Sequence, residues 1–111
     1  MTAEPGEELL QKLRHRDAVV RRQAARAIGA TRLKEGVHEL MQVLEEDSSA
    51  PVRRAAAEAL GRIGDPAAQG PLERALRSER DPGVRQAAVA ALARLGIGTG
   101  DYPGSLPVSE E

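Results

Sequence analysis

The apolar positions of the chain follow two helical patterns that alternate along most of its length. One pattern is rich in leucine, and Leu33, Val37, Leu40 and Leu44 are separated by steps of four, three and four residues. The other pattern is rich in alanine and is equally one-sided, so each pattern places its apolar residues on one face of a helix. The expected helices cover about 7–15, 18–29, 33–46, 50–63, 66–78 and 82–95.

The alanine-rich pattern is repeated three times at a constant interval. Residues 52–61 read Val-Arg-Arg-Ala-Ala-Ala-Glu-Ala-Leu-Gly, and related segments begin at Val20 and at Val84, equally far before and after Val52. A period of this length is typical of proteins built from stacked repeats. Because one such helix buries too little apolar area to be stable alone, and because alanine lets helix backbones approach closely, we expect the helices to stack tightly.

Capping residues and prolines indicate where several helices begin and end. Asp17 precedes the second predicted helix, and Asp65 and Asp81 each precede a proline, which is the usual order of an N-cap and a first helical residue. Gly29 and the turn Ala30-Thr31-Arg32 are expected to end the second helix. Pro71 falls inside the fifth, where it predicts a bend and one lost backbone hydrogen bond.

The repeated motif resembles HEAT repeats, in particular the short bacterial HEAT-like repeats named after phycobilisome lyases. The resemblance covers about residues 7–95 and implies an all-α, right-handed α-solenoid of three helix pairs. It also implies a protein that binds other proteins, although it does not say which ones. The motifs that carry it are Val-Arg-x-x-Ala-Ala-x-Ala-Leu-Gly at 52–61, Ile63-Gly64-Asp65-Pro66-Ala67, Pro71-Leu72 and Ala75-Leu76.

The length of 111 residues predicts one small domain followed by a tail. Pro5-Gly6 interrupts the first helical pattern, so residues 1–6 are expected to be loose. Glycine and proline dominate the last residues, which favours a flexible tail; a strap over the last repeat is the alternative. The expected units are a repeat domain at 1–95, with repeats at about 7–32, 33–64 and 65–95, and a tail at 96–111.

The net charge and the lack of cysteine indicate in which compartment the protein works and which partners its overall charge does not attract. A net charge of −1 creates no global field for nucleic acid or membranes. The chain has no cysteine, which fits a reducing compartment. No apolar run reaches transmembrane length, and residues 1–8 do not resemble a signal peptide. We therefore expect a cytoplasmic protein that does not bind membranes, and the resemblance to short bacterial repeats implies a bacterial one.

The charged residues are divided unequally between the two kinds of helix. The alanine-rich helices carry eight arginines against Glu58 alone, whereas the helix at 33–46 is mainly acidic. In the family that the chain resembles, the alanine-rich helices line the concave face. Guanidinium groups suit carboxylate recognition, so this face predicts an acidic protein partner. The expected partner-binding residues are Arg22, Arg26, Arg54, Arg62 and Arg94.

One column of the repeat holds an arginine in every copy. Two of the three arginines have an aspartate four residues upstream. The resemblance implies an Asp–Arg ladder between stacked repeats, with Asp47 or Ser49 in place of the missing acid of the middle copy. The expected ladder residues are Asp17, Arg21, Arg53, Asp81 and Arg85.

Catalytic residues, metal sites and cofactors are not expected. HEAT-like deoxyhypusine hydroxylases bind two irons through His-Glu pairs that follow the Val-Arg of several repeats, and here those positions hold neither residue. The one His-Glu pair, His38-Glu39, lies on a leucine-rich helix. No serine has a general base near it in the sequence, so nucleophilic catalysis is not indicated either.

The sequence thus predicts a non-catalytic scaffold or adaptor that binds an acidic peptide or protein surface. The alternative is a homo-oligomeric assembly module, such as a homodimer formed through Gln86, Ala87 and Ala90 or through an uncapped end of the stack. Weak nucleic-acid binding is less favoured, because the chain has no Trp or Phe to stack on bases. A chromophore-lyase role is disfavoured because no aromatic pocket is available for a bilin.

Overall fold

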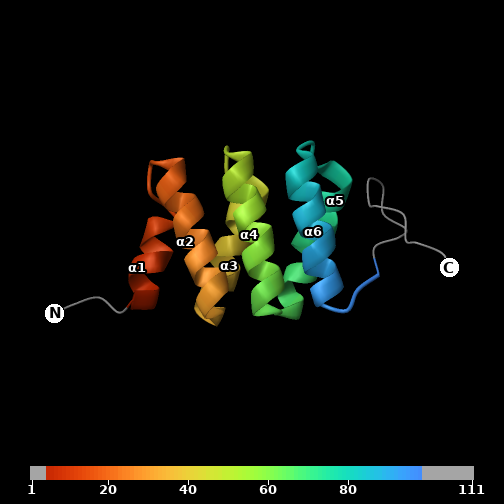
Figure 1. Cartoon of the computed structure of the whole chain (residues 1–111), viewed down its shortest axis with the longest axis horizontal. Helices are drawn as coiled ribbons and strands as arrows, with labels where there is room; N and C mark the ends of the chain where they lie inside the picture. The colour runs from red at the N-terminus through yellow and green to blue at the C-terminus, as the bar shows by residue number, and fades with distance from the viewer. Residues whose placement is uncertain (1–4, 99–111) are drawn as a thin grey trace.

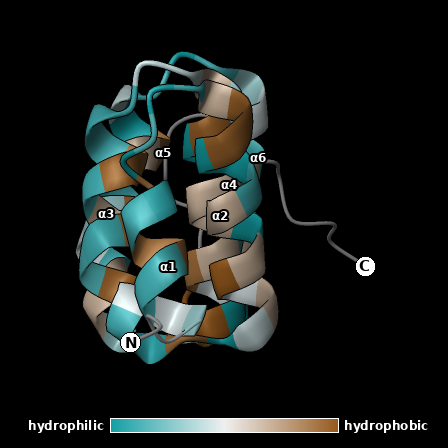
Figure 2. Ribbon diagram, turned by 90° about the vertical axis from the view of Figure 1, so that its left-hand side faces the viewer, coloured by the Kyte–Doolittle hydropathy of each residue, from teal (hydrophilic) through white to brown (hydrophobic). Residues whose placement is uncertain are grey.

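The computed structural model describes residues 5–98, and these form an all-α fold of three helix pairs in two layers (Figure 1). Helices α2, α4 and α6 lie side by side in one layer, and α1, α3 and α5 form the other (Figure 2). The predicted α-solenoid is therefore confirmed. The helices are α1 (Pro5–Lys12), α2 (Ala18–Thr31), α3 (Val37–Glu46), α4 (Ala50–Ile63), α5 (Gln69–Ser78) and α6 (Pro82–Arg94).

The hydrophobic core lies between the two layers. Leu40 and Leu72 of the leucine-rich helices are fully buried, as are Ile28, Leu60 and Leu92 of the alanine-rich helices. In Figure 2, hydrophobic residues, shown in brown, occur on the helices of both layers. Full burial of one such side chain contributes about 1.5–3 kcal/mol, so the stack depends on these contacts between layers rather than on any single helix.

Two glycines allow the alanine-rich helices to pack at very short distances. A Cβ atom at Gly29 would lie 2.7 Å from Cα of Ala59, and one at Gly61 would lie 2.8 Å from Cα of Ala91. Such distances exclude any side chain. The expectation that Gly29 ends its helix is wrong, because α2 continues to Thr31 and glycine serves here for close approach.

The leucine-rich helices begin differently from the prediction. A short 3₁₀ helix, η1 (Lys34–Gly36), precedes α3, and another, η2 (Pro66–Ala68), precedes α5. The α-helical part of α5 starts at Gln69, so Pro71 is its third residue. The predicted loss of a backbone hydrogen bond at Pro71 is therefore wrong, because the N–H groups of the first helical turn have no intrahelical partner to lose.

The first and last described residues test part of the predictions made for the two ends of the chain. Helix α1 already begins at Pro5, so Pro5-Gly6 belongs to the helix and is not loose. Proline at a first helical position is favourable because its ring fixes a helical φ angle. Residues 1–4 and most of the predicted tail lie outside the described residues, so the assignment of 96–111 as a tail remains a prediction.

Candidate functional site

Three adjoining grooves follow the exposed face of α2, α4 and α6. Their volumes are 440, 340 and 360 Å³, and Arg26 and Glu58 line all three, so the grooves form one continuous depression. Arginines predicted to bind a partner supply much of the lining. We call this surface the arginine groove, and its arginines are Arg22, Arg26, Arg54, Arg62 and Arg94.

Most of the arginines in the groove have no counter-ion within residues 5–98. Arg54 Nε lies 3.3 Å from Oε2 of Glu58, one helical turn later, and both side chains are exposed. Such exposed pairs contribute only about 0.3–0.5 kcal/mol. Within residues 5–98, the other four guanidinium groups make no ion pair. Since Asp81 is engaged as a helix cap, Glu58 is the main carboxylate that competes for these arginines.

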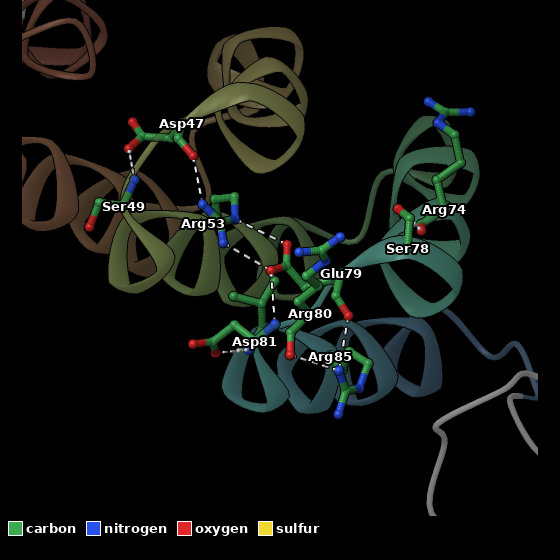
Figure 3. Close-up of polar contacts among 10 residues, drawn as sticks. Asp47, Ser49, Arg53, Arg74, Ser78, Glu79, Arg80, Asp81 and Arg85 are labelled. Atoms are coloured by element: carbon green, nitrogen blue, oxygen red, sulfur yellow. Dashed lines mark hydrogen bonds and ion pairs between the residues drawn. The ribbon is translucent and has the colours of Figure 1, made fainter.

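A ladder of bidentate ion pairs connects each helix pair to the next. Arg21 donates from Nε and Nη2 to the carboxylate of Asp47, at 2.8 and 3.0 Å. Arg53 makes the same fork to Glu79, at 3.0 and 2.9 Å (Figure 3). In both cases the acid lies in the loop that follows the next leucine-rich helix along the chain.

The predicted ladder acids Asp17 and Asp81 have another role. Asp17 accepts a hydrogen bond from the backbone N–H of Val19 at 2.9 Å, and Asp81 accepts one from Val84 at 3.0 Å. Both are N-caps, as their positions before helices predicted, and neither pairs directly with an arginine. An acid four residues before the arginine sits at the helix start, where its carboxylate binds backbone donors.

Glu79 is the ladder residue that the sequence interpretation missed. Asp47 and Glu79 are separated by one full repeat, as Arg21 and Arg53 are, so the two acids occupy the same position of consecutive repeats. Comparing equivalent positions of consecutive repeats would have identified Asp47 and Glu79 as a pair of ladder acids. Looking only for acids within a few residues of each arginine could not identify them. Arg85 holds the third ladder position, but no carboxylate pairs with it within residues 5–98.

The ion pairs of the ladder shift the pKa values of Arg21, Arg53 and Glu79. Hydrogen bonding to Asp47 raises the pKa of Arg21, and hydrogen bonding to Glu79 raises the pKa of Arg53, in each case against desolvation. Burial alone would raise the pKa of Glu79. Hydrogen bonds from Arg53 and from the backbone N–H of Asp81 outweigh burial and hold the pKa of Glu79 below its usual 4.5.

The lowered pKa of Glu79 predicts a pH-dependent contribution to folding. The stabilisation that the Glu79 carboxylate gives to the fold is present above the usual pKa of 4.5 and is lost as pH falls below it through the lower folded pKa. We expect Glu79→Gln to remove this part of the pH dependence. Urea unfolding of both proteins from above the usual pKa to below the folded pKa is the measurement, and parallel stability curves for wild type and variant would contradict the assignment.

The described residues bear on three other expectations, which concern a metal site, a membrane-spanning helix and an exposed patch for self-assembly. No group of three His, Asp or Glu side chains within residues 5–98 is placed to hold a metal ion. None of the helices described is both long and apolar enough to cross a membrane. Ala87, expected in an exposed assembly patch, is buried, because α6 turns this residue toward the core; Gln86 and Ala90 are exposed.

The two-layer stack of helix pairs with inter-repeat ion pairs defines an α-solenoid repeat protein. A family model described as HEAT repeats matches residues 6–93, and the chain therefore belongs to the HEAT repeat family. Proteins of this family commonly act as non-catalytic scaffolds for protein interactions. No curated protein sequence matches the chain significantly.

Proposed function

We propose that the protein is a non-catalytic adaptor that binds an acidic peptide or protein surface in the arginine groove. The observation that carries this proposal is the gathering of five exposed arginines along one depression, four of them without an ion pair within residues 5–98. Arginine forks recognise carboxylates with two parallel hydrogen bonds. A segment rich in Asp or Glu matches such a row.

The surroundings of the groove support a protein partner rather than a nucleic acid. Small side chains, including Ala27, Ala30 and Ala90, form the surface between the arginines, and no aromatic residue among residues 5–98 lies there. Single-stranded nucleic acids need aromatic platforms for much of their affinity. The proposal places the adaptor in the cytoplasm of a bacterium, on the basis of its cysteine-free sequence and its resemblance to short bacterial repeats.

A charge-reversal experiment tests the groove directly. We expect Arg22→Glu/Arg26→Glu/Arg54→Glu to weaken binding of a labelled hexaglutamate peptide by roughly a hundredfold, because three attractive contacts become repulsive. Fluorescence anisotropy measures the affinity, and wild-type binding should weaken with added salt. Glu58→Gln should bind the peptide more tightly, because it removes the competing carboxylate from the centre of the groove.

A matched control separates the groove from net charge. Lys12→Glu/Arg14→Glu/Arg16→Glu changes the net charge equally, and these three exposed residues lie outside the arginine groove. This control should bind almost as well as wild type. If both triple variants lose affinity equally, the attraction is non-specific and the groove proposal is wrong. If only the groove variant loses affinity, capture from cell lysate with wild type and both variants would then identify the natural partner.

A further inference from the structure

The third arginine of the ladder, Arg85, is arranged like the first two but pairs with no carboxylate within residues 5–98. Nη1 of Arg21 donates to the carbonyl oxygens of His15 and Arg16, at 2.8 and 3.0 Å. Nη1 of Arg85 donates to those of Glu79 and Arg80, at 2.9 and 3.0 Å (Figure 3). The Nε and Nη2 groups, which bind a carboxylate in the first two copies, have no partner at Arg85 within residues 5–98.

We propose that Arg85 is a carboxylate-binding site at the C-terminal edge of the stack, which takes an Asp or Glu side chain from a loop or extended segment of a partner protein. The chain itself shows twice that this fork, held by backbone carbonyls, binds a carboxylate with two hydrogen bonds. Arg85 is half-buried, so its hydrogen bonds are less exposed to water than those of a free surface arginine.

A second copy of the chain does not supply the missing acid. The ladder acids Asp47 and Glu79 are one repeat apart, and the equivalent position in the first repeat is His15. Head-to-tail stacking of two copies would therefore place an imidazole, not a carboxylate, opposite Arg85. The charge complementarity of the ladder thus favours a different protein as the occupant.

A closely stacked helix of the HEAT type does not fit this edge either. Ala93 stands at the position that Gly61 holds one repeat earlier, and a Cβ at Gly61 would come within 2.8 Å of Cα of Ala91. Val89 likewise replaces the smaller Ala57. The edge of α6 therefore keeps a following helix farther away, which favours a loop or extended segment that reaches Arg85 with its side chain.

The proposed site is separate from the arginine groove and relies on the proposed function only for the acidic character of the partner. Arg85 lines none of the three grooves, whereas Arg94, on the same helix, lines one of them. A partner that lies in the groove and continues around the end of α6 would meet both. The two sites must therefore be measured individually.

Nuclear magnetic resonance of the full chain tests the site with a capped hexaglutamate peptide as the probe. The Nε–Hε resonances of Arg21 and Arg53 report an occupied fork, and that of Arg85 should move toward them as the peptide is added. Arg85→Lys keeps the charge but loses the fork. We expect it to weaken binding at the α6 edge, followed through backbone amides 86–89, by roughly tenfold.

Three other outcomes would overturn the inference, and a fourth would separate it from the groove proposal. If groove resonances shift while Arg85 stays still, the groove proposal stands and this site does not exist. If Arg85 resonates in the occupied region before peptide is added, and Asp101→Asn/Glu110→Gln/Glu111→Gln shifts it back, the chain fills its own fork. If sedimentation shows a dimer that Arg85→Gln dissociates, a second copy is the occupant. A moving Arg85 resonance with peptide affinity unaffected by groove reversal supports this site and refutes the groove.

Discussion

Gly61→Ala is expected to lower the free energy of unfolding by about 2 kcal/mol, although alanine has the better helix propensity by about 1 kcal/mol. The added methyl group would lie 2.8 Å from Cα of Ala91 and 2.9 Å from its Cβ. The nearest obstacle is backbone, so relief requires α4 and α6 to move apart. That movement would loosen every other contact between these two helices.

The chain provides a matched control for this substitution. Gly70 is also helical, and apart from its neighbour Pro71 a Cβ there meets only the end of the Arg74 side chain, at 3.5 Å, which is an ordinary contact. Gly70→Ala should therefore lower stability by less than Gly61→Ala, because the better helix propensity of alanine offsets the contact of its Cβ with the Pro71 ring. Chemical denaturation followed by circular dichroism compares the two variants. Equal effects would show that close helix approach is not what glycine provides at position 61.

Glycine in the alanine-rich helices also shows what the sequence could and could not establish. The constant repeat period and the apolar spacing were sufficient to predict six helices and their pairing, because both follow from local patterns. Glycine at the end of an alanine-rich helix has two common uses, a helix end or a close contact. Choosing between them at Gly29 requires the distance to Ala59 of the next alanine-rich helix, which depends on how the repeats stack.

The candidate site was predictable to a similar degree. Five arginines were identified because they lie on the alanine-rich helices but outside the ladder column. In the structure all five line the arginine groove; they are Arg22, Arg26, Arg54, Arg62 and Arg94. The partners of the ladder arginines were not identified correctly. Their acids come from the following repeat, so the pairing depends on where the loops after α3 and α5 bring Asp47 and Glu79.

Removing Arg53 is the second change with a large expected effect. The side chains of Arg53 and Glu79 are only 19% and 11% exposed, so water replaces their hydrogen bonds poorly. Arg53→Ala would leave Glu79 largely buried with only the backbone N–H of Asp81 as a donor. Since loss of a charged hydrogen-bond partner in such a setting is costly, we expect a loss of about 2–3 kcal/mol in the free energy of unfolding.

Arg85→Ala is the natural control, because Arg85 holds the same repeat position and donates to two backbone carbonyls, yet pairs with no carboxylate within residues 5–98. Its removal should lower stability by only about 1 kcal/mol. The difference between the two variants then measures what the carboxylate adds to the ladder, and combining Arg53→Ala with Glu79→Gln should recover part of the loss, because no charge is left unpaired. Equal losses at positions 53 and 85 would mean that the backbone carbonyls, rather than the acid of the next repeat, account for the stabilisation. The ion pair between repeats would then fix their orientation without contributing to the free energy of unfolding.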